Sequence, residues 1–117
     1  MGNINDTVVN GFFEIREYVE NGRSPFAEWF GDLEKVTADR VNMYIRRLEA
    51  GNFGAAKPLQ DGVLEVRMDF GPGFRVYYGR EGSTIIILLG GGSKRRQDAD
   101  IAAAVARWKR YKQTRRT

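Results

Sequence analysis

The sequence predicts an α+β fold, in which helices pack on one face of a mostly antiparallel sheet. Residues 63–70 and 74–79 alternate between apolar and polar side chains, which is typical of strands with one buried face. Residues 84–89 are apolar on both faces and therefore suit a strand inside the sheet. Segments with apolar residues every three or four positions precede and follow these strands. The expected order is strand, helix, helix, strand, strand, strand, helix, with two N-terminal helices packed on a small antiparallel-dominated sheet and a C-terminal helix.

A strand and a turn are expected first. Within residues 12–19, Phe13 and Ile15 alternate with polar neighbours, as in a half-buried strand. Asn21 and Gly22 then break the pattern.

Two helices are expected next. A serine oxygen accepts hydrogen bonds from the free N–H groups of a helix, and proline suits the first helical position. Ser24 and Pro25 therefore predict a helix start. A second helix is expected over residues 37–50, where a glycine follows. Its apolar face contains Val41, Ile45 and Leu48.

The register of the strand pair that follows depends on its turn. The Gly-Pro-Gly sequence at residues 71–73 indicates a tight turn of three residues. In that register Asp69 faces Arg75, and Arg67 faces Tyr77.

The last part of the chain is expected to contain a junction and a helix. Three glycines and a serine at residues 90–93 predict a flexible junction. A helix is expected over residues 98–112, with Ile101, Val105 and Trp108 on its apolar face.

Composition excludes several classes of protein. The chain has 117 residues, of which 42% are hydrophobic and 29% are charged, as is typical of a globular protein. Because it contains no cysteine and no histidine, disulfide scaffolds, thiolate metal sites and histidine general bases are excluded. The apolar run at residues 85–89 is too short to span a bilayer, and residues 1–6 lack a signal-peptide pattern. We expect one cytoplasmic domain over residues 1–117, with no cofactor and no metal site.

The positive charge is concentrated near the C-terminus. The net charge is +4. Residues 94–117 contain nine Lys or Arg and two Asp, whereas the preceding residues are net negative. Clustered positive charge favours polyanions such as nucleic acid. An alternative is a basic helix and tail, about residues 98–117, that aid solubility or face an acidic partner.

The polar face of the predicted hairpin gathers charged side chains. A face with many fixed cations suits a phosphodiester, because each arginine places two donors on phosphate oxygens. The alternative is a solvated sheet face with one minor ion pair. The face comprises Glu65, Arg67, Asp69, Arg75 and Tyr77, with Lys57 in a preceding loop and Lys94, Arg95, Arg96 and Gln97 after the last strand.

A combined pattern of motifs covers about residues 12–112. It consists of GVLEVR at residues 62–67, GPGFRVYY at 71–78, LLGGGSK at 88–94, SPF at 24–26 and LEAGNFG at 48–54. This pattern resembles the RelE/ParE/HigB toxin superfamily, and within it the phage-derived, Gp49-like addiction module killers of HigB type.

The resemblance implies the toxin of a type II toxin–antitoxin system, which arrests translation and growth until its antitoxin neutralises it. Relatives of RelE and HigB type cleave mRNA, usually in the ribosomal decoding site, whereas ParE relatives inhibit DNA gyrase. The implied partners are a cognate helix-turn-helix antitoxin of HigA type, mRNA on the ribosome and, only through the antitoxin complex, operator DNA. No membrane is implied.

The resemblance also implies roles for individual residues. Arg67 and Lys94 fall at basic active-site positions, and Arg75 falls where the family holds the scissile phosphate. We expect a metal-independent endoribonuclease (mRNA interferase), in which Lys94 protonates the leaving 5′-oxygen and Glu65 or Asp69 is the base. The other residues expected to bind RNA are Lys57, Tyr77, Arg95, Arg96 and Gln97.

Two other functions stay open. The absence of histidine slightly favours a ParE-like, non-nuclease inhibitor of gyrase. The basic C-terminal segment also fits a non-catalytic nucleic-acid-binding remnant.

Overall fold

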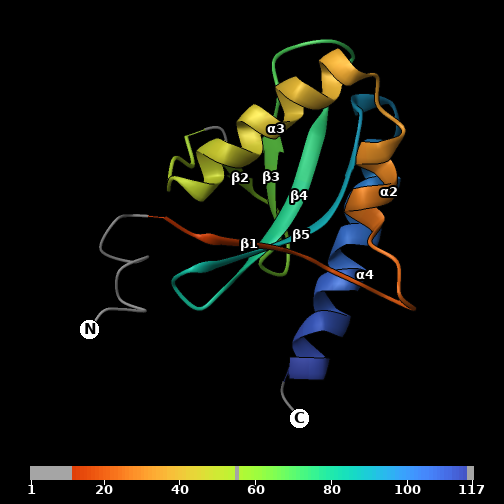
Figure 1. Cartoon of the computed structure of the whole chain (residues 1–117). Helices are drawn as coiled ribbons and strands as arrows, with labels where there is room; N and C mark the ends of the chain where they lie inside the picture. Colours follow the sequence, from red (N-terminus) through yellow and green to blue (C-terminus); the bar gives the residue numbers. More distant parts are fainter. Residues whose placement is uncertain (1–11, 55, 116–117) are drawn as a thin grey trace.

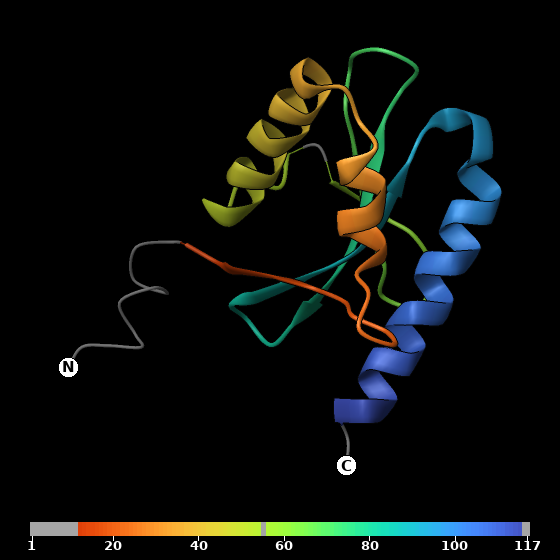
Figure 2. The same cartoon turned by 45° about the vertical axis from the view of Figure 1, so that its right-hand side comes forward.

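The molecule is a five-stranded sheet with helices against both of its faces (Figure 1; Figure 2). The computed structural model describes residues 12–54 and 56–115, so residues 1–6, for which we expect no signal peptide, lie outside it. The predicted α+β class is confirmed. No helix among the described residues is long and apolar enough to cross a bilayer.

The strands are β1 (Glu14–Glu17), β2 (Ala56–Pro58), β3 (Leu64–Arg67), β4 (Arg75–Glu81) and β5 (Ile85–Gly92). The helices are α2 (Pro25–Gly31), α3 (Lys35–Glu49), the 3-10 turn η1 (Lys94–Arg96) and α4 (Gln97–Arg115).

The sheet is mixed, in the order β1-β5-β4-β3-β2. β1 runs parallel to β5, and the other neighbouring strands are antiparallel, as expected for an antiparallel-dominated sheet. The edge strand β2 is an element that we did not predict. Lys57, which we expected in a loop, lies in β2 and pairs with Glu65 of β3. Pro58 is tolerated there because an edge strand leaves one side of its backbone without ladder partners.

Two apolar cores lie on the two faces of the sheet. The first is shared with α2 and α3, and the second is shared with α4. β5 contributes to both, which confirms its prediction as an interior strand. Ile86 and Leu88 belong to the first core, and Ile87 and Leu89 belong to the second. The expectation that the helices share one face is therefore wrong for α4, because β4 and β5 present apolar side chains on both faces.

Local sequence signals set the ends of the two N-terminal helices. Ser24 is the N-cap of α2, and its Oγ accepts a hydrogen bond from the Ala27 N–H at 3.0 Å. Pro25 occupies the first helical position, as predicted. Gly51 follows α3 with a φ of 86°, a left-handed conformation that ends helices and favours glycine. α3 begins at Lys35, slightly before the predicted start.

The register of the β3–β4 hairpin differs from the prediction. Arg67 pairs with Arg75 and not with Tyr77, so the two strands are shifted by two positions. A shift of two keeps each side chain on its predicted face, because the side-chain period of a strand is two. The expected Asp69–Arg75 pair is wrong, and Glu65 is the carboxylate that lies beside Arg75.

The loop of this hairpin is longer than the predicted three residues, and it contains two glycines with positive φ. Gly71 and Gly73 have φ values of 58° and 77°, which L side chains rarely adopt. The last ladder bond joins the Met68 N–H to the Phe74 carbonyl at 2.9 Å. The rings of Phe70 and Phe74 lie 5.5 Å apart and pack against the first core. Aromatic packing and glycine conformations therefore decide the register.

The glycine segment at residues 90–92 is the end of β5 and not the flexible junction that we expected. A Cβ on Gly91 would lie 2.2 Å from the ring of Trp29. A Cβ on Gly92 would lie 2.0 Å from Oδ2 of Asp100. Glycine is required here because α2 and α4 approach the strand closely from its two faces.

An aromatic contact holds α4 on its face of the sheet. A Cβ on Gly79 would lie 2.7 Å from the ring of Trp108, so the indole lies directly on the backbone of β4. Tyr111 stacks on Trp108 with ring planes 7° apart, and its hydroxyl donates to Glu81 at 2.6 Å. Hydrogen bonds from Tyr111 and Arg115 outweigh burial and hold the pKa of Glu81 below its usual value.

We expect Gly91→Ala to destabilise the fold by about 1–3 kcal/mol, because its Cβ has no room against Trp29. Gly31→Ala is the matched control. Nothing lies within 4 Å of a Cβ at Gly31, and alanine favours the helix by up to about 1 kcal/mol. Chemical unfolding of both variants measures the difference. A Gly91→Ala protein as stable as the wild type would contradict this close packing.

We expect Tyr111→Phe to lower the free energy of unfolding at pH 7 but to have little effect at pH 2. A carboxyl whose pKa is lowered by folding stabilises the fold above its unfolded pKa, here 4.5, and loses that contribution as the pH falls through the lowered value. Denaturant unfolding of the variant and of the wild-type protein at the two pH values measures the loss of stability. Equal losses at both would show that Glu81 is not involved.

Candidate nucleic-acid interface

The polar side of β3 and β4 carries a buried ion pair. Nε of Arg75 and Oε2 of Glu65 lie 3.3 Å apart, and each side chain is 4% exposed. Arg75 also donates to the Gly73 carbonyl at 2.7 Å, and the Gln97 amide donates to Glu65 at 3.2 Å. These hydrogen bonds help to offset the cost of removing two charges from water. The alternative prediction of a solvated sheet face is therefore wrong for Glu65 and Arg75.

Tyr77 completes this buried layer. It pairs with Glu65 across the strands, it is 1% exposed, and its hydroxyl has no hydrogen-bond partner among the described residues. Burial raises the pKa of Tyr77 far above its usual value, and the negative charges of Glu65 and Asp100 add to this effect. The phenol therefore stays protonated at neutral pH, where it can donate a hydrogen bond but cannot act as a base.

Three cations lie at the surface around the buried layer. Lys57, Arg67 and Lys94 are exposed, and within the part of the chain that the structure describes none of their side chains makes a hydrogen bond or an ion pair. Lys57 pairs with Glu65, and Arg67 lies two positions further along β3, so both point to the same face. Lys94 lies next to the hairpin loop, because a Cβ on Gly73 would be 3.6 Å from its Cβ. Unpaired cations on one surface attract phosphate groups.

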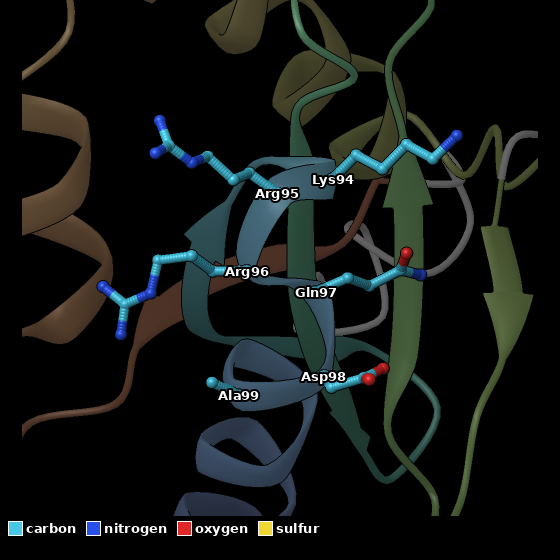
Figure 3. A pocket seen from close by; sticks show the side chains of 6 residues that line it. All are labelled: Lys94, Arg95, Arg96, Gln97, Asp98 and Ala99. Atoms are coloured by element: carbon cyan, nitrogen blue, oxygen red, sulfur yellow. The ribbon is translucent and has the colours of Figure 1, made fainter.

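The 3-10 turn η1 and the first turn of α4 divide the remaining predicted residues between two sides. Residues 94–99 line an open pocket of about 430 Å³. Lys94, Gln97 and Asp98 extend toward β3, whereas Arg95 and Arg96 point to the opposite side (Figure 3). Side chains three or four positions apart share a helix face, which explains the division. The cations after β5 are therefore not one cluster.

The flank of α4 that faces α2 carries further candidate residues, which we did not predict from the sequence. The side chains of Asp100 and Trp29 lie there directly against the backbone of the glycine segment at residues 90–92. Burial raises the pKa of Asp100, and the charges of Arg96 and Arg107 oppose the rise. The signal available in the sequence was the run of glycines at the end of an apolar strand, because glycine in a strand marks a place where another group approaches the backbone closely. No group of three acidic, histidine or cysteine side chains among the described residues is arranged to hold a metal ion.

We expect Glu65→Ala to lower the free energy of unfolding by about 3–5 kcal/mol, because it leaves the guanidinium of Arg75 buried without its carboxylate. The double change Glu65→Leu with Arg75→Met should recover most of this loss. Asp39→Ala is the control, since Asp39 is 66% exposed in its ion pair with Lys35 and should stay near wild-type stability. Denaturant unfolding measures all three. A Glu65→Ala protein that matches the control would contradict the role of the pair.

No protein-family model matches the chain. A stretch of 80 residues, 68% of the chain, is 42% identical to a protein of Haemophilus influenzae that is described as an uncharacterized protein. The match covers 81% of that protein, so the two chains share most of their length. The chain therefore belongs to the same protein family as this Haemophilus protein.

Proposed function

We propose that the protein is the toxin of a type II toxin–antitoxin system and cleaves mRNA on the ribosome as a metal-independent endoribonuclease. The observation that supports the proposal most directly is that the side chains of Lys57, Arg67 and Lys94 are exposed without a partner among the described residues. They come from three elements and lie around the buried layer. The sequence motifs that resemble the RelE/ParE/HigB superfamily support the proposal. A cognate helix-turn-helix antitoxin of HigA type then keeps the protein inactive, and the complex contacts operator DNA.

Arg67 is the arginine that we assign to the scissile phosphate. Arg75, to which the resemblance gave this role, is enclosed with Glu65 and is a positioning residue in this proposal. A guanidinium places two parallel donors on phosphate oxygens and stays charged at any working pH. Arg67 would therefore also stabilise the extra negative charge that develops on the non-bridging phosphate oxygens.

Proton transfer in this reaction needs one acid and one base. The 2′-oxygen of the ribose attacks the adjacent phosphorus, the bond to the 5′-oxygen breaks, and a 2′,3′-cyclic phosphate and a 5′-hydroxyl result. We assign Lys94 to protonate the leaving 5′-oxygen. Glu65 is not free to act as the base, because it is held by Gln97 and Arg75, so we assign this step to the exposed Asp69.

We expect Arg67→Ala and Lys94→Ala each to reduce mRNA cleavage by about 100-fold or more, because each removes charge or proton transfer at the reacting phosphate. Inducible expression in a bacterium, followed by primer extension on abundant transcripts, measures new 5′ ends. Lys109→Ala, an exposed lysine of α4, is the control and should cleave normally. Undiminished cleavage and growth arrest in both site variants would refute the assignment.

A second candidate is a non-nuclease inhibitor of DNA gyrase. It is favoured by the enclosure of Glu65 and Tyr77, which removes two proton-transfer groups from the surface in a chain without histidine. Growth arrest with intact transcripts, together with inhibition of supercoiling by the purified protein, would support it. Normal supercoiling at micromolar protein would remove it.

A further inference from the structure

A second cavity lies on the flank of α4 that faces α2. Its volume is about 250 Å³, and it opens beside the glycine segment at residues 90–92. β1 pairs only with the first half of β5, up to Leu88, so among the described residues no strand covers this part of the edge. The cavity walls come from α2 (Pro25, Glu28, Trp29, Asp32), β4 and β5 (Tyr77, Gly90, Gly91) and α4 (Asp100, Ala103, Arg107).

Three polar side-chain groups of this cavity, those of Asp32, Tyr77 and Asp100, have no partner in the part of the chain that the structure describes. The Tyr77 hydroxyl is enclosed without a hydrogen bond. The Asp100 carboxylate makes neither a hydrogen bond nor an ion pair, although its Oδ2 lies tightly over Gly92. The Tyr77 hydroxyl is the buried one of these groups, and a buried polar group without a hydrogen bond is unfavourable and calls for an explanation. A ligand with both donors and an acceptor would satisfy Tyr77 and Asp100.

Charges of both signs lie around the cavity, and one of them is Asp32, an exposed carboxylate for which the described residues supply no side-chain partner. Glu28 is paired with Arg23, and Arg107 donates to the Leu89 carbonyl at 3.0 Å. The cations Arg96 and Arg107 act on Asp100 and offset its charge. A basic side chain of another protein would be repelled by these cations as well as attracted by Asp32 and Asp100, whereas a neutral group with N–H donors can bind Asp100 without that repulsion.

The dimensions of the cavity suit one planar ring system. Pockets for drug-sized molecules hold roughly 300–1,000 Å³, and this cavity is smaller. Trp29 supplies an aromatic wall, which is a common surface for nucleobases in single-stranded RNA. Arg95 and Arg96 point to the same flank, where they can reach the neighbouring phosphates (Figure 3).

We propose that this cavity binds a guanine base of the RNA substrate and makes Asp100 and Tyr77 specificity-determining residues. The inference rests on the proposed ribonuclease function and names its preferred base. Guanine is the RNA base whose pairing edge offers two adjacent N–H donors, N1–H and N2–H, and both can donate to one carboxylate. Its O6 lies next to them and accepts a hydrogen bond, which the Tyr77 hydroxyl donates.

The test measures binding without cleavage. The probes are fluorescent 2′-O-methyl oligouridines with one central guanine, inosine or adenine, because methylation blocks the attacking 2′-oxygen. Inosine lacks only the N2 amino group of guanine. Fluorescence anisotropy with the full chain should show guanine bound about 5- to 100-fold more tightly than adenine, with inosine between them.

Two variants and one matched control test which side chains cause the preference for guanine. Asp100→Asn should reduce it to less than about twofold, because an amide offers one acceptor oxygen and adds a donor. Tyr77→Phe should weaken it without loss of stability, since the hydroxyl that it removes has no partner. Asp98→Asn should keep it, because Asp98 lies in the same first turn of α4 but points toward β3 (Figure 3).

The outcomes separate this inference from the proposed function. Equal binding of the three probes, or an unchanged preference in both variants, would overturn the guanine site, even if Arg67→Ala abolishes cleavage. A guanine preference that depends on Asp100 would support the site, even if no transcript is cleaved. Binding of acetyl-arginine amide near Asp100 in NMR titrations, without a response to the guanine probe, would assign the cavity to a protein partner instead.

Discussion

The close approach of two helices to opposite faces of β5 is the constraint on which the rest of the structure depends. Trp29 of α2 lies on Gly91, and Asp100 of α4 lies over Gly92, with no room for a Cβ at either glycine. This contact sets the position of the first turn of α4 against the sheet. Together with η1, that turn carries Lys94 and Gln97 on one flank and faces the smaller cavity with the other. A side chain in the glycine segment would move both sites together.

The buried Glu65–Arg75 pair is better explained by positioning than by stability. Apolar residues of similar volume are often as stable as a buried ion pair, or more so, because two charges must be removed from water. In this protein the pair has a structural consequence, since Glu65 binds Gln97 and thereby connects β3 to the start of α4. The carboxylate and the guanidinium thus support the surface on which Arg67 and Lys94 are exposed.

Helix α4 separates two kinds of chemistry on its flanks. On the β3 flank, exposed cations without partners suit the negative phosphate backbone. On the α2 flank, Asp100 and Tyr77 present fixed polar groups beside an aromatic wall. Proteins that recognise RNA commonly separate backbone contacts, which position the strand, from base contacts, which select the sequence. The proposed function and the guanine site divide the surface in the same way.

The sequence by itself determined which residues face which side of the strands, because side chains alternate with a period of two. It also determined where α2 starts, through the Ser24 cap, and that β5 is interior, through its unbroken apolar run. Tertiary structure alone decided the hairpin register, the burial of Arg75 and the place of α4 on the second face. These features depend on contacts between segments far apart in the chain, such as Gln97 with Glu65 and Trp108 with Gly79. A local pattern records the periodicity of one element, but it does not record which distant side chain will cover that element.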